Sequence, residues 1–278
     1  MLTQEEILER RNFIGGSDVP IILGLSNYKT PLVLYLEKTG VLEIEAKEET
    51  PAQKWGRLNE PLIRAEFEKR HGILVPELNK QYHPEYAFIR GNLDGFNEER
   101  NLVWEGKMSS AFMKHAWGEE GTDVIPAEYL CQIATYCSIK NANDGFLTAL
   151  IGVEERDFYY GRDRDLEGMV IEATINFWDC VQQRREPDPV NMDDCRIKFR
   201  STDPEKTIMA NDDSLLAYAR LGSLKAEMNH LEEKQSKLKM EIMCHMKDAE
   251  LLVDGYGAPL VTWKANKKGT RTFLMKGV

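Results

Sequence analysis

Apolar residues recur at helical spacing in several stretches of the chain, and these stretches are expected to form its helices. The longest such pattern in the N-terminal half covers residues 51–71. It ends at Gly72 and contains Pro61, which should kink or interrupt the helix. Capping residues predict two shorter helices, one over 18–24 behind Ser17 and one opened by Thr30 and a proline. Three further helices are expected at residues 3–11, 126–140 and 163–185.

Strands are predicted where β-branched and aromatic residues cluster between turn signals. Residues 86–90 and 102–107 form one such pair, joined by a turn-rich stretch, and residues 146–153 and 156–160 form a second pair. The mostly charged segment 43–50 reads as an exposed loop. Helices, strands, a helix, strands and a helix follow one another, which predicts an α/β fold with a central mixed sheet flanked by helices.

The pattern changes at residues 187–189, where two prolines flank an aspartate. We therefore expect a core over residues 1–190, a linker over 191–213 and an extension over 214–278 that ends in a β-hairpin. The extension begins with a long helix, predicted for 214–247, whose stripe has alternating steps of three and four residues: Leu221, Leu224, Met228, Leu231, Gln235, Leu238 and Ile242. Such a stripe serves packing within the chain, an intermolecular coiled coil or a partner-binding arm.

Composition limits the possible functions of this chain of 278 residues. Its net charge of −10 argues against a protein that simply coats DNA, but it suits a nuclease whose carboxylates gather metal ions. The five cysteines are scattered without a CxxC pair, so neither a disulfide framework nor a four-cysteine metal site is expected. The start of the chain is charged, and no apolar run reaches the roughly 20 residues of a membrane span. We expect a cytoplasmic protein that does not interact with membranes.

Candidate chemistry is concentrated in residues 88–107. Asp94 follows a predicted strand, and eleven residues later Glu105 and Lys107 alternate on the next strand, so their side chains share one face. Two carboxylates are hard oxygen ligands for Mg²⁺, and a lysine beside them offsets negative charge that develops on a phosphate. This spacing alone also fits a solvated hairpin with a surface ion pair. Val103 and Trp104 favour a buried strand instead.

A second candidate site surrounds residues 15–18, with the sequence GGSD. A glycine turn that leads into a helix offers free N–H groups and the positive end of the helix dipole to an anion. Ser17 would either cap this helix or donate to a phosphate.

Five ordered motifs between about residues 5 and 180 resemble the YqaJ-type viral recombinase family, which includes the lambda exonuclease and belongs to the PD-(D/E)XK nuclease superfamily. The motifs are RRNFIGGSDVPIILGLSNYKTPLVLYLEKTG, WGRLNEPLIRAEFEKRHG, IRGNLDGF, WEGK and AEYLCQIATYCSI. The resemblance implies a restriction-endonuclease-like core. It also implies a Mg²⁺-dependent exonuclease that digests linear double-stranded DNA from a phosphorylated 5′ end.

The resemblance also assigns roles at the acidic site. It implies that Asp94 and Glu105 are the principal metal ligands, that the Gly106 carbonyl is a further ligand, and that Lys107 is the catalytic lysine. Glu60 would sit near the metal and order a second Mg²⁺ ion, and Mn²⁺ would substitute for Mg²⁺.

Further roles concern the attacking water and the DNA end. Tyr129 and Gln132 share one helix face and match the family's tyrosine and glutamine near the nucleophilic water. Arg10 matches an arginine that binds the 5′ phosphate together with Ser17, and Arg11 is an equal alternative. Asn92 replaces a serine of the lambda enzyme two residues before the metal aspartate, so its phosphate contact is in doubt.

The resemblance implies partners as well. It predicts a homo-oligomer, a ring-shaped trimer in that family, and a single-strand annealing protein that binds the exposed 3′ strand. The gene would belong to a phage or prophage in a bacterial cell. Two other functions stay open: a structure-specific or restriction-like endonuclease on the same core, and a non-catalytic protein that binds DNA ends.

Overall fold

The structure is a computed structural model that describes residues 8–42 and 49–277. The chain forms two compact units, one up to Thr202 and one from Asp203 onward. The predicted segments 3–7 and 43–48 lie outside the described residues. No helix in the described part of the chain is long and apolar enough to cross a membrane.

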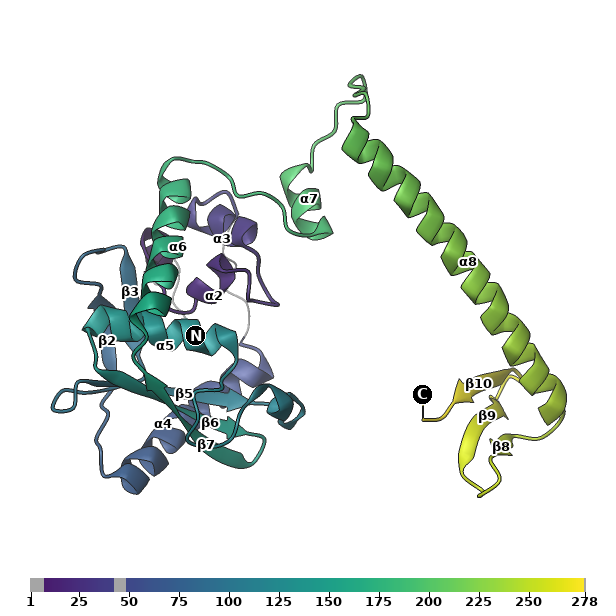
Figure 1. Cartoon of the computed structure of the whole chain (residues 1–278), viewed down its shortest axis with the longest axis horizontal. Helices are drawn as coiled ribbons and strands as arrows, with labels where there is room; N and C mark the ends of the chain where they lie inside the picture. Colours follow the sequence, from purple (N-terminus) through teal and green to yellow (C-terminus); the bar gives the residue numbers. More distant parts are fainter. Residues whose placement is uncertain (1–7, 43–48, 278) are drawn as a thin grey trace. The chain divides into compact units, whose positions relative to one another are not determined.

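A four-stranded sheet forms the centre of the N-terminal unit (Figure 1). Its strands are β4 (Gly95–Asn97), β5 (Leu102–Ser109), β6 (Asp144–Ile151) and β7 (Glu154–Gly161), in this order across the sheet. Strands β5 and β6 run parallel, whereas β4–β5 and β6–β7 are antiparallel. The sheet is therefore mixed, as the order of the predicted elements indicated.

A second sheet is built from the three strands that precede β4 in the sequence. β3 (Ile89–Leu93) lies at its centre, with β1 (Ile14–Gly15) parallel on one side and β2 (Leu78–Tyr82) antiparallel on the other. β1 and β2 were not predicted, and residues 86–88, expected in a strand, precede β3 in a turn. β1 brings the GGSD segment to the strand that leads into Asp94.

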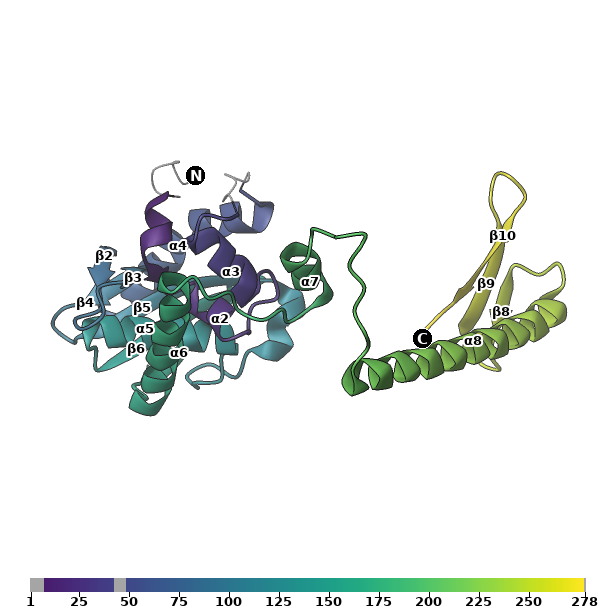
Figure 2. The same ribbon diagram turned by 90° about the horizontal axis from the view of Figure 1, so that it is seen from above.

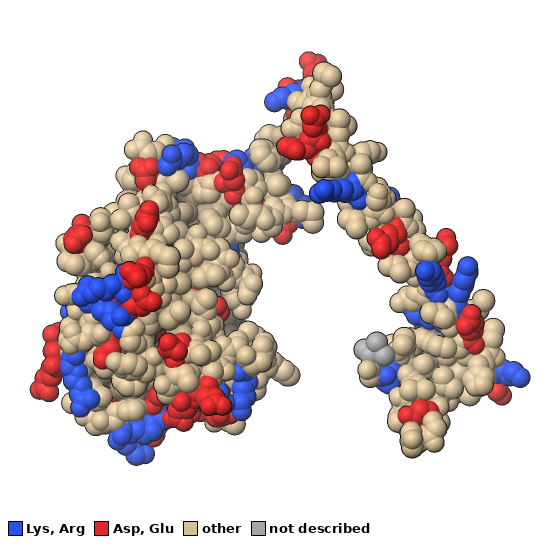
Figure 3. Space-filling model, in the orientation of Figure 1, with Lys and Arg blue, Asp and Glu red and all other residues tan. Residues whose placement is uncertain are grey.

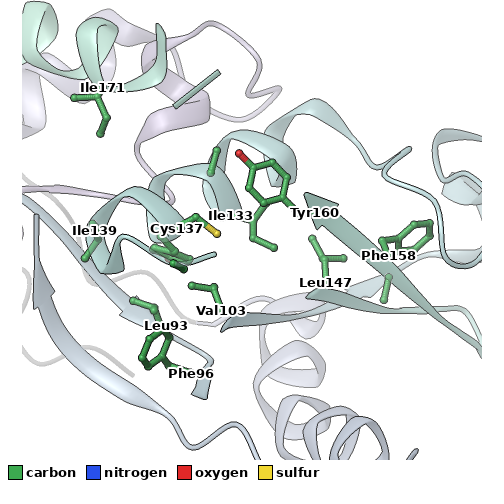
Figure 4. Packing of buried hydrophobic residues seen from close by; sticks show 14 of the residues in the cluster. Leu93, Phe96, Val103, Ile133, Cys137, Ile139, Leu147, Phe158, Tyr160 and Ile171 are labelled. Carbon is green, nitrogen blue, oxygen red and sulfur yellow. The ribbon is translucent and has the colours of Figure 1, made fainter. Parts of the chain in front are cut away.

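Two helices cover opposite faces of the four-stranded sheet (Figure 1). α4 (Pro51–His71) packs on the face that carries Trp104, and α5 (Ala127–Lys140) packs on the face that carries Val103. Alternate residues of a strand point to opposite faces, so β5 contributes side chains to both cores. Figure 4 shows Val103 and Leu147 packed against Ile133 and Cys137 of α5.

A third layer of helices builds on α5. α6 (Arg164–Gln182) and α2 (Val19–Ile22) pack against it, and α3 (Pro31–Lys38) packs against both of these helices (Figure 2). Together they bury a core that includes Ile14 and Phe177. The short 3-10 helices η1 (Arg10–Asn12) and η2 (Ala111–Ala116) complete the unit with α7 (Met192–Lys198).

Local capping chemistry explains why several helices begin and end where they do. The Thr30 side chain accepts a hydrogen bond from Val33 N at the start of α3, as predicted. Thr50 and Gln53 form a capping box that opens α4, and Gly72 ends this helix in the left-handed conformation. α4 continues through Pro61 without interruption.

Ser17 is not the cap that the sequence suggested. α2 begins at Val19 behind Asp18, has no side-chain cap and spans only four residues. The Asp18 carboxylate instead accepts a hydrogen bond from Gly15 N and closes the turn. Ser17 is exposed and does not cap the helix.

The C-terminal unit contains α8 (Asp212–Met246) and a small antiparallel sheet. The sheet has three strands, β8 (Leu251–Val253), β9 (Pro259–Ala265) and β10 (Arg271–Met275), where the sequence predicted a hairpin of two. The segment predicted as a linker contains α7, whose N-cap Asn191 accepts a hydrogen bond from Asp194 N.

Candidate active site

Strand β5 presents two charged side chains to α5. Glu105 and Lys107 share the face of Val103, because they lie two and four residues after it. Lys107 Nζ donates to Glu105 Oε1 at 2.5 Å, and the Glu105 side chain is almost wholly buried, with 1% exposed. The strand thus holds an ion pair on the face of the sheet that α5 covers.

α5 supplies polar and aromatic groups to the same place. Gln132 Nε2 donates to Glu105 Oε1 at 2.7 Å, and Lys107 Nζ lies 5.4 Å from the centre of the Tyr129 ring. Gln132 Nε2 also contacts the Tyr136 hydroxyl at 3.1 Å. Tyr136 was not predicted as a site residue, although its position four residues after Gln132 places it on the same helix face.

Asp94 joins this group from the turn between β3 and β4. Its Oδ2 accepts a hydrogen bond from Gly106 N at 3.1 Å, which fixes the carboxylate beside the strand of Glu105. Glu60 approaches from α4, but its nearest partner is Arg64, one turn later on the same helix, at 3.1 Å. Sequence reasoning did not identify Arg64, although a spacing of four residues predicts such a pair.

Burial raises the pKa of all three carboxylates at this site. Burial, followed by the charge of Asp94, raises the pKa of Glu105 to about 8, although Lys107 opposes the shift. Burial also raises the pKa of Asp94 and of Glu60, and the Asp94 charge adds to the shift at Glu60. Burial alone would lower the pKa of Lys107, but the Glu105 and Asp94 carboxylates outweigh it and raise that pKa.

The donor atoms present at this site fit a hard divalent cation. Glu105 Oε2 is buried and has no hydrogen-bond partner among the described residues, and Asp94 lies beside it. Within residues 8–42 and 49–277, no group of three or more acidic, histidine or cysteine side chains is arranged to hold a metal ion. Mg²⁺ does not need three such side chains, because it binds through one or two carboxylates and completes its shell with waters and phosphate oxygens.

Gly106 lies between the two site residues of β5 for a steric reason. Its missing side chain would point to the opposite face, where a Cβ atom would come within 2.7 Å of the Trp104 ring. Glycine at this position therefore lets the Trp104 indole pack against the strand. The backbone N–H of Gly106 donates a hydrogen bond to the Asp94 carboxylate.

A buried ion pair supports the GGSD turn. Lys38 Nζ donates at 2.6 Å to the Asp18 carboxylate and to the Phe13 carbonyl, and at 2.7 Å to the Arg10 carbonyl. Burial lowers the pKa of Lys38, and the Asp18 charge opposes this shift. No sequence signal indicated this contact, because the two charged residues are 20 positions apart in the chain.

Arg10 and Ser17 face a cleft of about 460 Å³ that Tyr129 and Gln132 also line. The Arg10 guanidinium donates to Ser17 Oγ at 3.4 Å. Arg11 is directed elsewhere, because its guanidinium lies 3.3 Å from where a Cβ of Gly40 would be. Of the two arginines that the sequence left open, Arg10 is therefore the one beside Ser17.

The structure brings most of the predicted site residues together, but not all. The acidic site gathers six of them: Asp94, Glu105, Gly106, Lys107, Tyr129 and Gln132. Glu60 lies at its edge and is paired with Arg64. Asn92 is exposed in a neighbouring hollow that Arg10 and Ser17 also line, and its Oδ1 accepts a hydrogen bond from Lys80 N.

Sequence comparisons identify relatives along most of the chain. The model of the YqaJ-like viral recombinase domain matches residues 8–143. The uncharacterized protein YqaJ of Bacillus subtilis (strain 168) is 31% identical over 264 residues, which cover 90% of this chain and 80% of that protein.

Solved structures share the fold at lower sequence identity. The alkaline exonuclease LHK-Exo of Laribacter hongkongensis aligns with a TM-score of 0.50 at 18% identity. A structure of LHK-Exo in complex with dAMP aligns with a TM-score of 0.52 at 19% identity. Each alignment covers 66% of this chain and 94% of the other chain.

Proposed function

The chain belongs to the YqaJ-like viral recombinase family, and from this premise we propose that it is a Mg²⁺-dependent exonuclease. Its substrate would be linear double-stranded DNA, digested from the 5′ end to release 5′ mononucleotides. The observation that carries the proposal is the buried Glu105 carboxylate. One of its oxygens is bound by Lys107 and Gln132, and the other is left without a hydrogen-bond partner among the described residues, next to Asp94.

Asp94, Glu105 and the Gly106 carbonyl are the groups that would hold the metal, with Glu60 available for a second ion. Bound Mg²⁺ (or Mn²⁺ in its place) would lower the pKa of a coordinated water and neutralise charge on the scissile phosphate. Burial, followed by the charge of Asp94, raises the pKa of Glu105, and a divalent cation would offset both effects by stabilising the charged carboxylate.

Protein side chains supply the remaining chemistry. The Lys107 ammonium, fixed by Glu105, offsets the negative charge that grows on the phosphate during attack. The Gln132 amide nitrogen donates to Glu105, and the amide oxygen, which accepts no hydrogen bond from the described residues, would orient a water for attack. Tyr129 lies over Lys107 and limits the space in which that ammonium can move.

The preference for a 5′ end would come from the adjoining cleft. Arg10 and Ser17 offer a guanidinium and a hydroxyl, the donors that bind a terminal phosphate well. Because this cleft also reaches Tyr129 and Gln132, a phosphate held there would place the next phosphodiester near the acidic site. Asn92 would contact the DNA only peripherally, because its side-chain oxygen accepts a hydrogen bond from the backbone N–H of Lys80.

The product of this reaction would be duplex DNA with a 3′ single strand. A single-strand annealing protein is the partner that would bind this strand for recombination. We place the reaction in the cytoplasm of a bacterial host, with the gene carried by a phage or prophage, and the enzyme in a homo-oligomer.

The test uses DNA substrates that differ only in their ends. With Mg²⁺, we expect digestion of a linear duplex with 5′-phosphate ends, slower digestion with 5′-hydroxyl ends, and no digestion with a chelator. Covalently closed circular DNA should stay intact. Nicking of the circle would identify an endonuclease, and end binding without hydrolysis would identify a non-catalytic protein; either result contradicts the proposal.

A further inference from the structure

Helix α8 carries an apolar stripe that its own unit leaves uncovered. Five stripe residues expose between 55% and 67% of their surface: Leu221, Leu224, Met228, Leu231 and Leu238. Within the described part of α8, burial is confined to its last turns, where Met246 is buried. A long helix with such a stripe gains its stability in water mainly when another surface covers the stripe.

The spacing of the stripe specifies the kind of surface that covers it. Steps of three and four residues alternate from Leu221 through Gln235 to Ile242, so they follow the a and d positions of three consecutive heptads. A narrow seam of this kind fits another helix in a coiled coil, whereas packing on a sheet or a globular core calls for a wider apolar face.

Charged residues beside the seam decide how a second copy of α8 would lie. In a parallel pair, each g residue meets the e residue five positions later on the other copy. All three such pairs carry like charges: Arg220 with Lys225, Glu227 with Glu232, and Lys234 with Lys239. A parallel pairing of two copies is therefore disfavoured along the whole seam.

The antiparallel arrangement reverses this result. When Met228 faces Leu231 of the second copy, the seam also pairs Leu221 with Leu238. Three flanking pairs then have opposite charge, Arg220 with Glu241, Glu227 with Lys234, and Lys225 with Glu232, and no flanking pair has like charge. The centre of this alignment falls between residues 229 and 230, at the middle of α8, so both helices overlap along nearly their full length. Figure 3 shows charged side chains of both signs along this helix.

We propose that α8 is a self-association surface, on which a second copy of this chain docks in an antiparallel two-helix coiled coil. A two-fold axis relates the copies, so each pair occurs twice. The apolar stripe provides affinity, and the alternating charges select the direction. The proposal does not depend on the nuclease assignment, because no residue of α8 takes part in that site.

Charge reversal at one flanking position tests the proposal on the full chain. Glu227→Lys would place two lysines opposite each other in both symmetric pairs, and we expect roughly tenfold or greater weakening of self-association. The control Glu233→Lys makes the same charge change on the outer face of α8. Sedimentation equilibrium should give the wild type and the control twice the mass of the Glu227→Lys variant at micromolar concentration.

A second substitution should restore the contact. Lys234→Glu alone should dissociate the copies, whereas Glu227→Lys combined with Lys234→Glu, or a mixture of the two single variants, should reassociate. Circular dichroism would verify that each variant keeps its helix. Three results would overturn the proposal: a wild-type mass equal to that of the variant, tighter association of Glu227→Lys, which a parallel pair predicts, or an equal loss in the Glu233→Lys control.

Discussion

Glu105 illustrates how the neighbours of one side chain determine its chemistry. Lys107 and Gln132 both donate to Oε1 of this carboxylate. Its other oxygen, Oε2, accepts no hydrogen bond from the described residues. Burial makes the charged form costly and, with the Asp94 charge, raises the pKa of this carboxyl to about 8. A metal ion and a proton therefore compete for this residue.

This competition predicts how Mg²⁺ binding depends on pH. The folded-state pKa of Glu105 is raised, so below about 8 the metal must displace a proton before the carboxylate can bind it. The Mg²⁺ affinity should rise with pH, by up to about tenfold per unit, and level off above about pH 8. Isothermal titration calorimetry of the DNA-free protein would measure this. An affinity that stays flat between about pH 6 and about pH 8 would refute the expectation.

The two neighbouring arginines allow a matched test of end recognition. Arg10→Ala should lower the preference for 5′-phosphate over 5′-hydroxyl ends by about tenfold, because a charge-assisted hydrogen bond to the phosphate is lost. Arg11→Ala removes the same charge beside Gly40 and should leave the preference unchanged. Digestion rates on both substrates give the ratio; an equal effect of the two variants would speak against Arg10.

At the scale of elements, β5 combines a catalytic face with a packing face. Glu105 and Lys107 face α5, whereas Trp104 and the open side of Gly106 face α4. This alternation follows from strand geometry and could be predicted from the sequence. The need for glycine at position 106 could not, because it arises from the way the Trp104 ring lies under the strand.

Gly106→Ala should destabilise the protein by about 1–3 kcal/mol, because its Cβ would overlap the Trp104 ring at 2.7 Å. Gly168→Ala is the control, since no described atom lies within 4 Å of a Cβ at that exposed position of α6. The control should stabilise the helix by about 0.5–1 kcal/mol. Urea unfolding compares the two variants, and equal midpoints would show that Trp104 does not constrain position 106.

The sequence predicted best those elements whose ends are marked by local signals such as helix caps. Thr30, Pro31 and Gly72 indicated helix ends that the structure has, because caps act within a few residues. Ser17 misled for the same reason: a serine before an apolar run resembles a cap, but Asp18 closes that turn through Gly15 and Lys38. Contacts between residues far apart in the sequence carried no such signal.

In the candidate site, too, some contacts could be predicted from the sequence and others could not. The spacing of Asp94, Glu105 and Lys107 indicated their proximity, because Asp94 immediately precedes β4, which pairs with the strand that carries Glu105 and Lys107. The pairing of Glu60 with Arg64 depended on which face of α4 meets the sheet, which periodicity alone left unspecified.

At the scale of the whole molecule, the two units are joined by an exposed segment without regular structure between α7 and α8. Arg200 and Lys206 lie in it, so trypsin should cut there before it cuts within α5 or α6. Mass spectrometry of early fragments would locate the cuts. Cleavage at Lys140 or Arg164 while this segment is intact would contradict the division into two units.

Hydrolysis of DNA by the acidic site is the central claim, and one measurement tests it most directly. Nucleotide release from a 5′-phosphorylated linear duplex would be compared for the wild type and for Asp94→Ala, Glu105→Ala and Lys107→Ala, each verified to be folded. We expect each variant to lose at least about a hundredfold in rate, as the removal of a group that stabilises the transition state does. Wild-type rates in all three folded variants would contradict the claim.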